Sequence, residues 1–246
     1  SRANIDLPGV QQELLEAVYQ ANPNIVLVLN NGRPLALPWA DANIPAIVEA
    51  WQLGTESGNA IAQVLYGDYN PSGKLPMTFP RSVGQLPIYY NQKTTGRPVE
   101  NGEDSVFWSH YTDEENTPLY PFGYGLSYSK FEYSDLKVSS PSFSSNGKIT
   151  VSVNVKNTSK VDGKEVVQMY LKDLIGSVTR PMKELKGFEM VSLKANETKT
   201  VTFTIDSKLI EFYTANNKWE AEPGDFKVFI GGSSDAKLEG SFEYKG

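Results

Sequence analysis

The chain has 246 residues, of which 39% are hydrophobic and 21% charged, with a formal net charge of −6 and no cysteine. This length favours one large domain or two small ones, with a core that needs no disulfides. The missing cysteines exclude a disulfide scaffold, a thiolate zinc site and a thiol nucleophile, and the acidic balance argues against nucleic acid and anionic membranes as partners.

The first half of the chain alternates helical and strand patterns. Apolar residues at helical spacing predict a helix over 10–22, and the continuous apolar run 25–29 predicts a strand covered on both faces. A second strand is expected over 46–51, followed by a helix that Thr55 would cap and Gly67 would close. This order predicts a parallel sheet with helices on its faces, as in a partial α/β sandwich.

Residues 67–128 are rich in turn residues and in aromatic side chains. A connection of this length without regular structure is usually a functional loop or a strap across another domain. Disordered linkers are poor in aromatic residues, so we expect this segment to pack against folded parts of the chain.

From about Phe131 the hydrophobic pattern changes to a period of two. Seven or eight short strands are expected, from runs near 131–138, 149–156, 165–172, 185–191, 199–205, 209–213, 226–231 and 239–244. Strands at this spacing over about a hundred residues predict an all-β sandwich of the immunoglobulin or fibronectin type III kind. We therefore expect part of an α/β domain over 1–87, an aromatic strap or linker over 88–130, and the sandwich over 131–246.

Few residues indicate a self-contained active site. His110 is the only histidine, which excludes a multi-histidine metal site within this chain, and a hydrogen-bonding loop residue is the preferred interpretation over a general base. Four acidic residues of the strap could form a calcium site or a solvated loop, and the second interpretation is preferred: Asp104, Asp113, Glu114 and Glu115. We expect no metal and no cofactor. Of the four tryptophans, Trp108 is the best candidate for stacking on a sugar, and the others are expected to pack in a core or an interface.

Several sequence blocks occur in a fixed order along the chain. They include Ser1-Arg2-x-x-Ile5-x-Leu7-Pro8, Val26-Leu-Val-Leu29-x-Asn31-Gly-Arg33-Pro34, Glu49-Ala-Trp51, Gly67-Asp-Tyr-Asn-Pro-Ser-Gly-Lys-Leu-Pro76, Pro118-Leu-Tyr-Pro-Phe-Gly-Tyr-Gly-Leu-Ser-Tyr128 and Arg180-Pro-x-Lys-x-Leu-Lys-Gly-Phe-Glu189. Together they resemble the C-terminal part of family 3 glycoside hydrolases, and most of all the bacterial β-glucosidases that work in the periplasm.

The resemblance implies an enzyme with a (β/α)8-type barrel, an α/β sandwich and a fibronectin type III-like domain. Such enzymes remove terminal β-D-glucosyl residues with retention of configuration, using a barrel Asp as nucleophile and a Glu on an α/β-domain loop as acid/base. In similar sequences that Glu stands just before the Ser-Arg pair that opens this chain. We therefore expect a fragment without either catalytic carboxylate, which supports the acid/base loop and is inactive alone.

The same resemblance suggests residues and partners. Candidates for contact with an outer sugar subsite are Arg2, Arg97, Trp108 and Tyr111, and a purely structural role is the alternative for each. The expected partners are a β-glucoside or oligosaccharide and the missing N-terminal barrel portion. Neither nucleic acid binding nor membrane insertion is expected, since no apolar run approaches the ~18 residues of a membrane span. The expected location is periplasmic or secreted.

An alternative function comes from the sandwich itself, which could be a carbohydrate-binding or protein-docking module. Its best candidates are Tyr170, Phe212 and Tyr213, although core packing explains them equally well. A fold alone does not give a function, so this alternative depends on which aromatic side chains are exposed.

Overall fold

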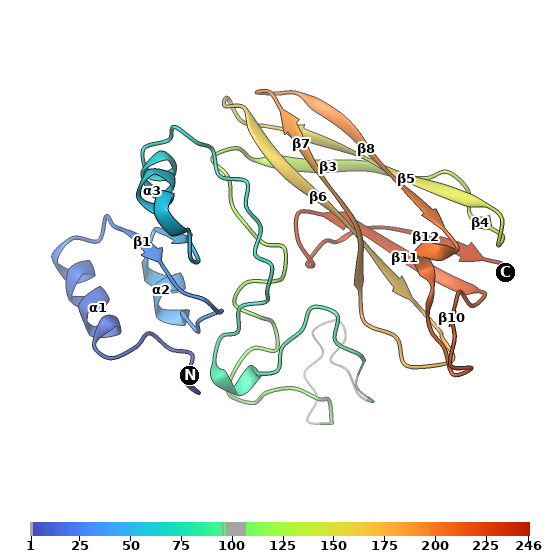
Figure 1. The fold of residues 1–246 in the computed structure, drawn as a ribbon, viewed down its shortest axis with the longest axis horizontal. Coiled ribbons are helices and arrows are strands. Elements are labelled where there is room, and N and C mark those ends of the chain that lie inside the picture. The colour runs from blue at the N-terminus through green and yellow to red at the C-terminus, as the bar shows by residue number, and fades with distance from the viewer. Residues whose placement is uncertain (1, 95, 97–106) are drawn as a thin grey trace. The chain divides into compact units, whose positions relative to one another are not determined.

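The computed structural model describes residues 2–94, 96 and 107–246 (Figure 1). They form two compact units: the α/β unit, residues 2–69, 77–88 and 111–121, and the sandwich unit, which takes in the rest of the described chain. Each unit is assembled from more than one stretch of sequence, so the linear division at residues 87 and 130 stays a prediction. Within the described ranges no helix is long and apolar enough to cross a membrane.

The α/β unit alternates helices and strands along the chain. Its elements are α1 (Gln11–Ala21), β1 (Val26–Leu29), α2 (Pro38–Asn43), β2 (Ala46–Glu49), the 3-10 turn η1 (Gly54–Glu56), α3 (Ser57–Leu65) and the 3-10 turn η2 (Val83–Gln85). β1 and β2 pair in parallel, from Val26 opposite Ala46 to Leu29 opposite Glu49. The predicted order of elements and the parallel pairing are therefore confirmed.

The core of the α/β unit forms around the loop and helix that follow β1. Its buried side chains are Leu15, Leu29, Leu35, Leu37, Ala40 and Ile44. α1 contributes Leu15, and Tyr19 one turn later packs edge-on against Trp39 with ring centroids 5.6 Å apart. Val10 and Leu14, on the predicted apolar face of this helix, are 68% and 62% exposed, so that face is not the one that packs among the described residues.

Three local features of the α/β unit differ from the predictions. Thr55 lies inside η1 and does not cap α3, because the 3-10 turn leads directly into the helix and puts Glu56 at the N-cap position. α2 is not expected from the sequence; it begins at Pro38, whose fixed φ suits the first turn of a helix. β1 is expected to be covered on both faces, yet Val26 is half exposed.

The sandwich unit contains two main sheets, of five strands in the order β4-β12-β11-β6-β7 and of three in the order β3-β5-β8 (Figure 1). The strands are β3 (Phe131–Val138), β4 (Ser142–Phe143), β5 (Lys148–Asn157), β6 (Gly163–Asp173), β7 (Glu184–Leu193), β8 (Thr198–Asp206), β11 (Gly224–Gly231) and β12 (Leu238–Tyr244). A separate hairpin pairs β9 (Phe212–Tyr213) with β10 (Trp219–Glu220). Seven of the eight predicted strands are confirmed, and the expected strand 209–213 is divided between the 3-10 turn η3 (Lys208–Ile210) and β9.

The hydrophobic core of the sandwich unit follows the alternation that predicts it. Ile149, Val151, Val153 and Val155 of β5 are 0–1% exposed, whereas the residues between them are only partly covered. Complete burial of such a side chain stabilises the fold by about 1.5–3 kcal/mol. The predicted fold class, an α/β part followed by a fibronectin type III-like sandwich, is confirmed.

The aromatic segment packs within each unit, as expected. In the sandwich unit, Tyr90 stacks on Phe122 with ring centroids 4.3 Å apart, and it meets buried Tyr170 edge-on at 5.9 Å. In the α/β unit, Phe79 is 1% exposed and its backbone N–H donates to the carbonyl oxygen of Tyr120 at 2.9 Å. These contacts fix the described parts of the segment that carry these side chains against their own unit.

Candidate functional site

The carboxyl ends of β1 and β2 lie at one edge of the α/β unit. Leu29 and Glu49 are opposite each other in the parallel register, and the Ala50 N–H donates to the Leu29 carbonyl at 2.9 Å. The turn that follows β1 begins at Asn31, and the one that follows β2 contains Trp51. In open α/β sheets ligands bind beyond this edge, so the two turns define a candidate functional edge.

Arg33 fixes the beginning of the chain at this edge. Its guanidinium donates from Nη1 to the Arg2 carbonyl at 2.6 Å and from Nη2 to the Asn4 carbonyl at 3.1 Å. The Ala36 N–H donates to the Ile5 carbonyl at 3.0 Å and extends the attachment. The Arg2 side chain is exposed, whereas the Arg2 backbone is held beside the turn after β1 by the bond from Arg33.

Glu49, at the end of β2, has a carboxylate in an unusual environment. Its Oε1 accepts a hydrogen bond from the Trp51 N–H at 3.0 Å, and Trp51 adopts a left-handed backbone with φ of +50°. The atoms Glu49 Oε2 and Asn31 Oδ1 are buried without a hydrogen-bond partner among the described residues. Burial raises the pKa of Glu49, and the hydrogen bond from the Trp51 N–H opposes this rise in part.

Glu49 is not among the site residues predicted from the sequence, because it lies within the mainly apolar run 46–51 that predicts a strand. The available signal is its place: a carboxylate that ends a parallel strand stands at the edge where such sheets bind ligands. Left-handed φ at a residue with a large side chain, as at Trp51, is also typical of functional sites. The arrangement can position the turns at this edge, and it makes the ionised form of Glu49 costly.

Tyr111 lies in the same unit, on a segment that Arg81 holds. Arg81 forms an ion pair with Glu115 at 2.7 Å and donates to the Thr117 carbonyl at 3.0 Å. The Tyr111 hydroxyl donates to the Gly84 carbonyl at 3.4 Å, while 43% of the side chain stays exposed. Of the four acidic residues considered for calcium, Glu115 is thus neutralised by Arg81, and Asp104 lies outside the described residues.

The other predicted site residues lie elsewhere. Trp108 belongs to the sandwich unit and is partly buried, and its carbonyl oxygen is 2.9 Å from His110 Nδ1. Arg97 lies outside the described residues. Arg2 and Tyr111 therefore belong to the α/β unit, and Trp108 belongs to the sandwich unit.

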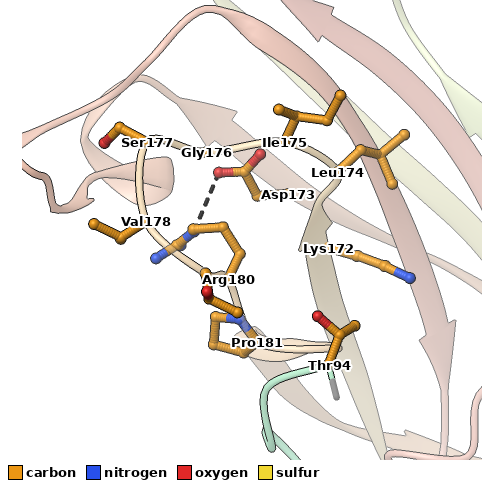
Figure 2. Close-up of a pocket in the computed structure, with 11 residues that line it drawn as sticks. Thr94, Lys172, Asp173, Leu174, Ile175, Gly176, Ser177, Val178, Arg180 and Pro181 are labelled. Carbon is orange, nitrogen blue, oxygen red and sulfur yellow. Dashed lines mark hydrogen bonds and ion pairs between the residues drawn. The ribbon is translucent and has the colours of Figure 1, made fainter. Parts of the chain in front are cut away.

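The sandwich unit has a hollow of about 400 Å³ beside the loop between β6 and β7 (Figure 2). Asp173 and Arg180 meet at its wall, with Oδ2 and Nε 3.1 Å apart, and Arg180 also pairs with Glu184 at 2.8 Å. The guanidinium carbon lies 3.9 Å from the centroid of the Phe212 ring. Burial raises the pKa of Asp173, and the nearby Arg180 charge opposes that rise. Because these charges neutralise one another, the cluster closes the loop and offers no free catalytic group.

Comparison with known proteins places this architecture in a family. Residues 1–128 match the glycosyl hydrolase family 3 C-terminal domain, and residues 165–234 match the fibronectin type III-like domain. The two matches fall in the same order along the chain as the α/β part and the sandwich strands. The chain belongs to glycoside hydrolase family 3.

Individual relatives are similar over almost the whole chain. A periplasmic β-glucosidase of Salmonella typhimurium is 54% identical over 99% of this chain, and a β-xylosidase of Formosa agariphila is 46% identical over 96%. The crystal structure of a β-glucosidase mutant from Listeria innocua in complex with laminaribiose matches 100% of this chain with a TM-score of 0.93 and 43% identity. The chain spans 32% of the length of each of the two sequences and 34% of the solved structure, about a third in every case.

Proposed function

We propose that this chain is the C-terminal part of a retaining, exo-acting β-glucosidase that removes terminal β-D-glucosyl residues. The observation that carries the proposal is the 54% identity with a periplasmic β-glucosidase over nearly the entire chain. The similarity to a β-glucosidase solved with laminaribiose supports a β-linked glucoside or oligosaccharide as substrate. No cofactor takes part in this proposal, since retaining hydrolysis needs only two carboxylates.

The role of this chain is to hold the acid/base loop in place. In the family resemblance that loop stands just before the segment that Arg33 fixes through the Arg2 and Asn4 carbonyls. Retention requires nucleophile and acid/base carboxylates ~5–5.5 Å apart, so a small displacement of the loop would impair catalysis. The nucleophile would come from an N-terminal barrel portion and the acid/base from the α/β-domain loop that stands before Ser1-Arg2 in similar sequences, and the chain alone would be inactive.

Contacts with the outer part of the substrate are proposed for Arg2, Arg97, Trp108 and Tyr111. Support comes from the exposure of the Arg2 and Tyr111 side chains, which keeps both accessible to a ligand. Trp108 offers an aromatic ring, the surface on which sugar rings stack.

Selection of the sugar would depend on parts of the enzyme outside this chain. Relatives named for two different sugars, a β-glucosidase and a β-xylosidase, are 54% and 46% identical to it. A region this similar in both enzymes would give the same structural support to a β-glucosidase and to a β-xylosidase. The location proposed for the enzyme is periplasmic or secreted, which the name of the Salmonella relative supports.

Hydrolysis of an aryl β-glucoside by the purified chain tests this proposal. We expect no release of the aryl alcohol above the buffer rate, because neither carboxylate of the mechanism is present. Mass spectrometry of the same sample establishes that no upstream polypeptide accompanies the chain. Turnover by the pure chain would contradict the assignment of both catalytic carboxylates to another part of the enzyme.

A further inference from the structure

The hairpin of β9 and β10 presents two exposed aromatic side chains side by side. Tyr213 and Trp219 are directly opposite in the antiparallel register, with ring centroids 6.1 Å apart and ring planes at 67°. Tyr213 is 53% exposed and Trp219 is 68% exposed. Packing in a core or interface is the sequence expectation for Trp219, and among the described residues its ring is exposed as one wall of an aromatic corner.

The aromatic corner stands on a hairpin that is fixed from both sides. Glu220 Oε1 accepts hydrogen bonds from Thr214 Oγ1 at 2.6 Å and from Asn216 Nδ2 at 3.0 Å. These bonds lower the pKa of Glu220, so its carboxylate stays ionised and keeps the turn closed. On the other side, Phe212 is buried beneath the Arg180 guanidinium. The hairpin backbone that carries the two rings is therefore fixed before any ligand arrives, which reduces the entropy lost on binding.

The surroundings of the corner favour a sugar over a protein as its ligand. Two aromatic side chains offer about 150–250 Å² each, well short of the ~800 Å² per partner of a stable protein interface. The turn beside them is exposed and polar, formed by Asn216, Asn217 and Lys218. A pyranose ring has an apolar face of C–H groups for an aromatic ring and a rim of hydroxyls for such amide and amine groups. Ring planes inclined at 67° form a corner, which fits one or two sugar units better than a flat polysaccharide face.

We propose that Tyr213 and Trp219 form a binding site for soluble β-linked glucan on the sandwich unit. The Trp219 ring stacks on one glucosyl unit, Tyr213 closes its side, and the polar turn hydrogen-bonds the hydroxyls. The identity of the sugar rests on the proposed β-glucosidase function, whereas the site itself rests on the geometry of the hairpin.

Affinity electrophoresis of the chain through gels containing laminarin, a soluble β-1,3-glucan, tests the site. We expect the wild-type chain to be retarded, and Trp219→Ala to raise the Kd about tenfold, as the loss of one aromatic contact. Trp219→Phe keeps a ring and should bind between the two. Tyr66→Ala removes an 85% exposed aromatic residue from the α/β unit and serves as the matched control, with unchanged retardation.

An unretarded wild-type chain would overturn the proposal, as would equal retardation of the wild type and Trp219→Ala. Circular dichroism of each variant establishes that the sandwich remains folded, which is expected for a residue as exposed as Trp219. The gel measures binding without turnover. A failure of the hydrolytic assignment would leave the gel result unaffected, so the two proposals fail separately.

Discussion

Arg33 Nη1 donates to the backbone carbonyl of Arg2 at 2.6 Å, across 31 positions of the sequence. A second bond from Nη2 to the Asn4 carbonyl makes the contact two-pronged. Two parallel donors fix direction as well as distance, which one ammonium group cannot do. Arg33 is therefore a positioning residue for the segment that, in the proposed enzyme, continues from the acid/base loop.

Replacing Arg33 by lysine in the full-length enzyme should impair the acid step selectively. A displacement of about 1 Å in a catalytic group can lower the rate about a hundredfold. We expect kcat/KM to fall by this order for an aryl glucoside with a poor leaving group, and much less for an activated dinitrophenyl glucoside, which needs little protonation. An equal fall for both substrates would show that Arg33 acts only through general stability.

Glu49→Gln should change how stability depends on pH. Because burial raises the Glu49 pKa above its ordinary 4.5, the folded state binds its proton more readily than the unfolded state. The free energy of unfolding therefore falls as the pH rises through the folded pKa, and glutamine removes this loss.

Unfolding of this Glu49 variant in urea at pH 4 and pH 7 measures the effect. The variant should gain stability relative to wild type between pH 4 and pH 7. The amide retains an oxygen acceptor for the Trp51 N–H. A variant that is clearly less stable than wild type at pH 7 would contradict the account.

Arg180→Ala should destabilise the sandwich strongly. The change removes the ion pairs with Asp173 and Glu184 and leaves Asp173, whose side chain is 5% exposed, without its counter-charge. Breaking a buried pair in this way costs about 3–5 kcal/mol. Thermal unfolding measures the loss, and Lys194→Ala, which breaks an exposed pair with Asp162, should cost less than about 1 kcal/mol.

A double variant separates charge from packing at the same site. Asp173→Asn combined with Arg180→Ala removes both partners and should recover part of the lost stability, because no unpaired buried charge remains. If the double variant were as unstable as Arg180→Ala alone, lost packing of the guanidinium over Phe212 would explain the effect instead.

Trp108→Ala in the full-length enzyme tests the outer-subsite proposal. If the ring contacts the second sugar, KM for cellobiose should rise more than KM for an aryl glucoside. Tyr66→Ala is again a suitable control for removing an exposed ring. Equal effects on the two substrates would remove Trp108 from the subsite.

More of the sandwich than of the candidate functional edge can be predicted from the sequence. Alternation of Ile149, Val151, Val153 and Val155 predicts a buried strand face, because side chains in a strand point to opposite faces with a period of two. The order of helices and strands in the first half likewise predicts the parallel pairing of β1 and β2.

Features set by tertiary context could not be predicted in the same way. As a large aromatic residue, Trp219 is expected in a core or an interface. The structure shows instead that it is exposed beside Tyr213, its partner in the β9–β10 pairing. Thr55 has the chemistry of an N-cap, yet the preceding 3-10 turn takes that position from it. Glu49 looks like a surface residue in a strand until the turns at Asn31 and Trp51 enclose it.

The most direct test of the central claim is a chimera. The corresponding third of the Salmonella typhimurium periplasmic β-glucosidase is replaced by this chain, and kcat/KM is measured with an aryl β-glucoside. If this chain supplies the structural support that family 3 enzymes share, kcat/KM of the chimera should lie within about tenfold of the value for the parent enzyme. A chimera that folds, as circular dichroism and gel filtration report, but hydrolyses no glucoside would contradict the account.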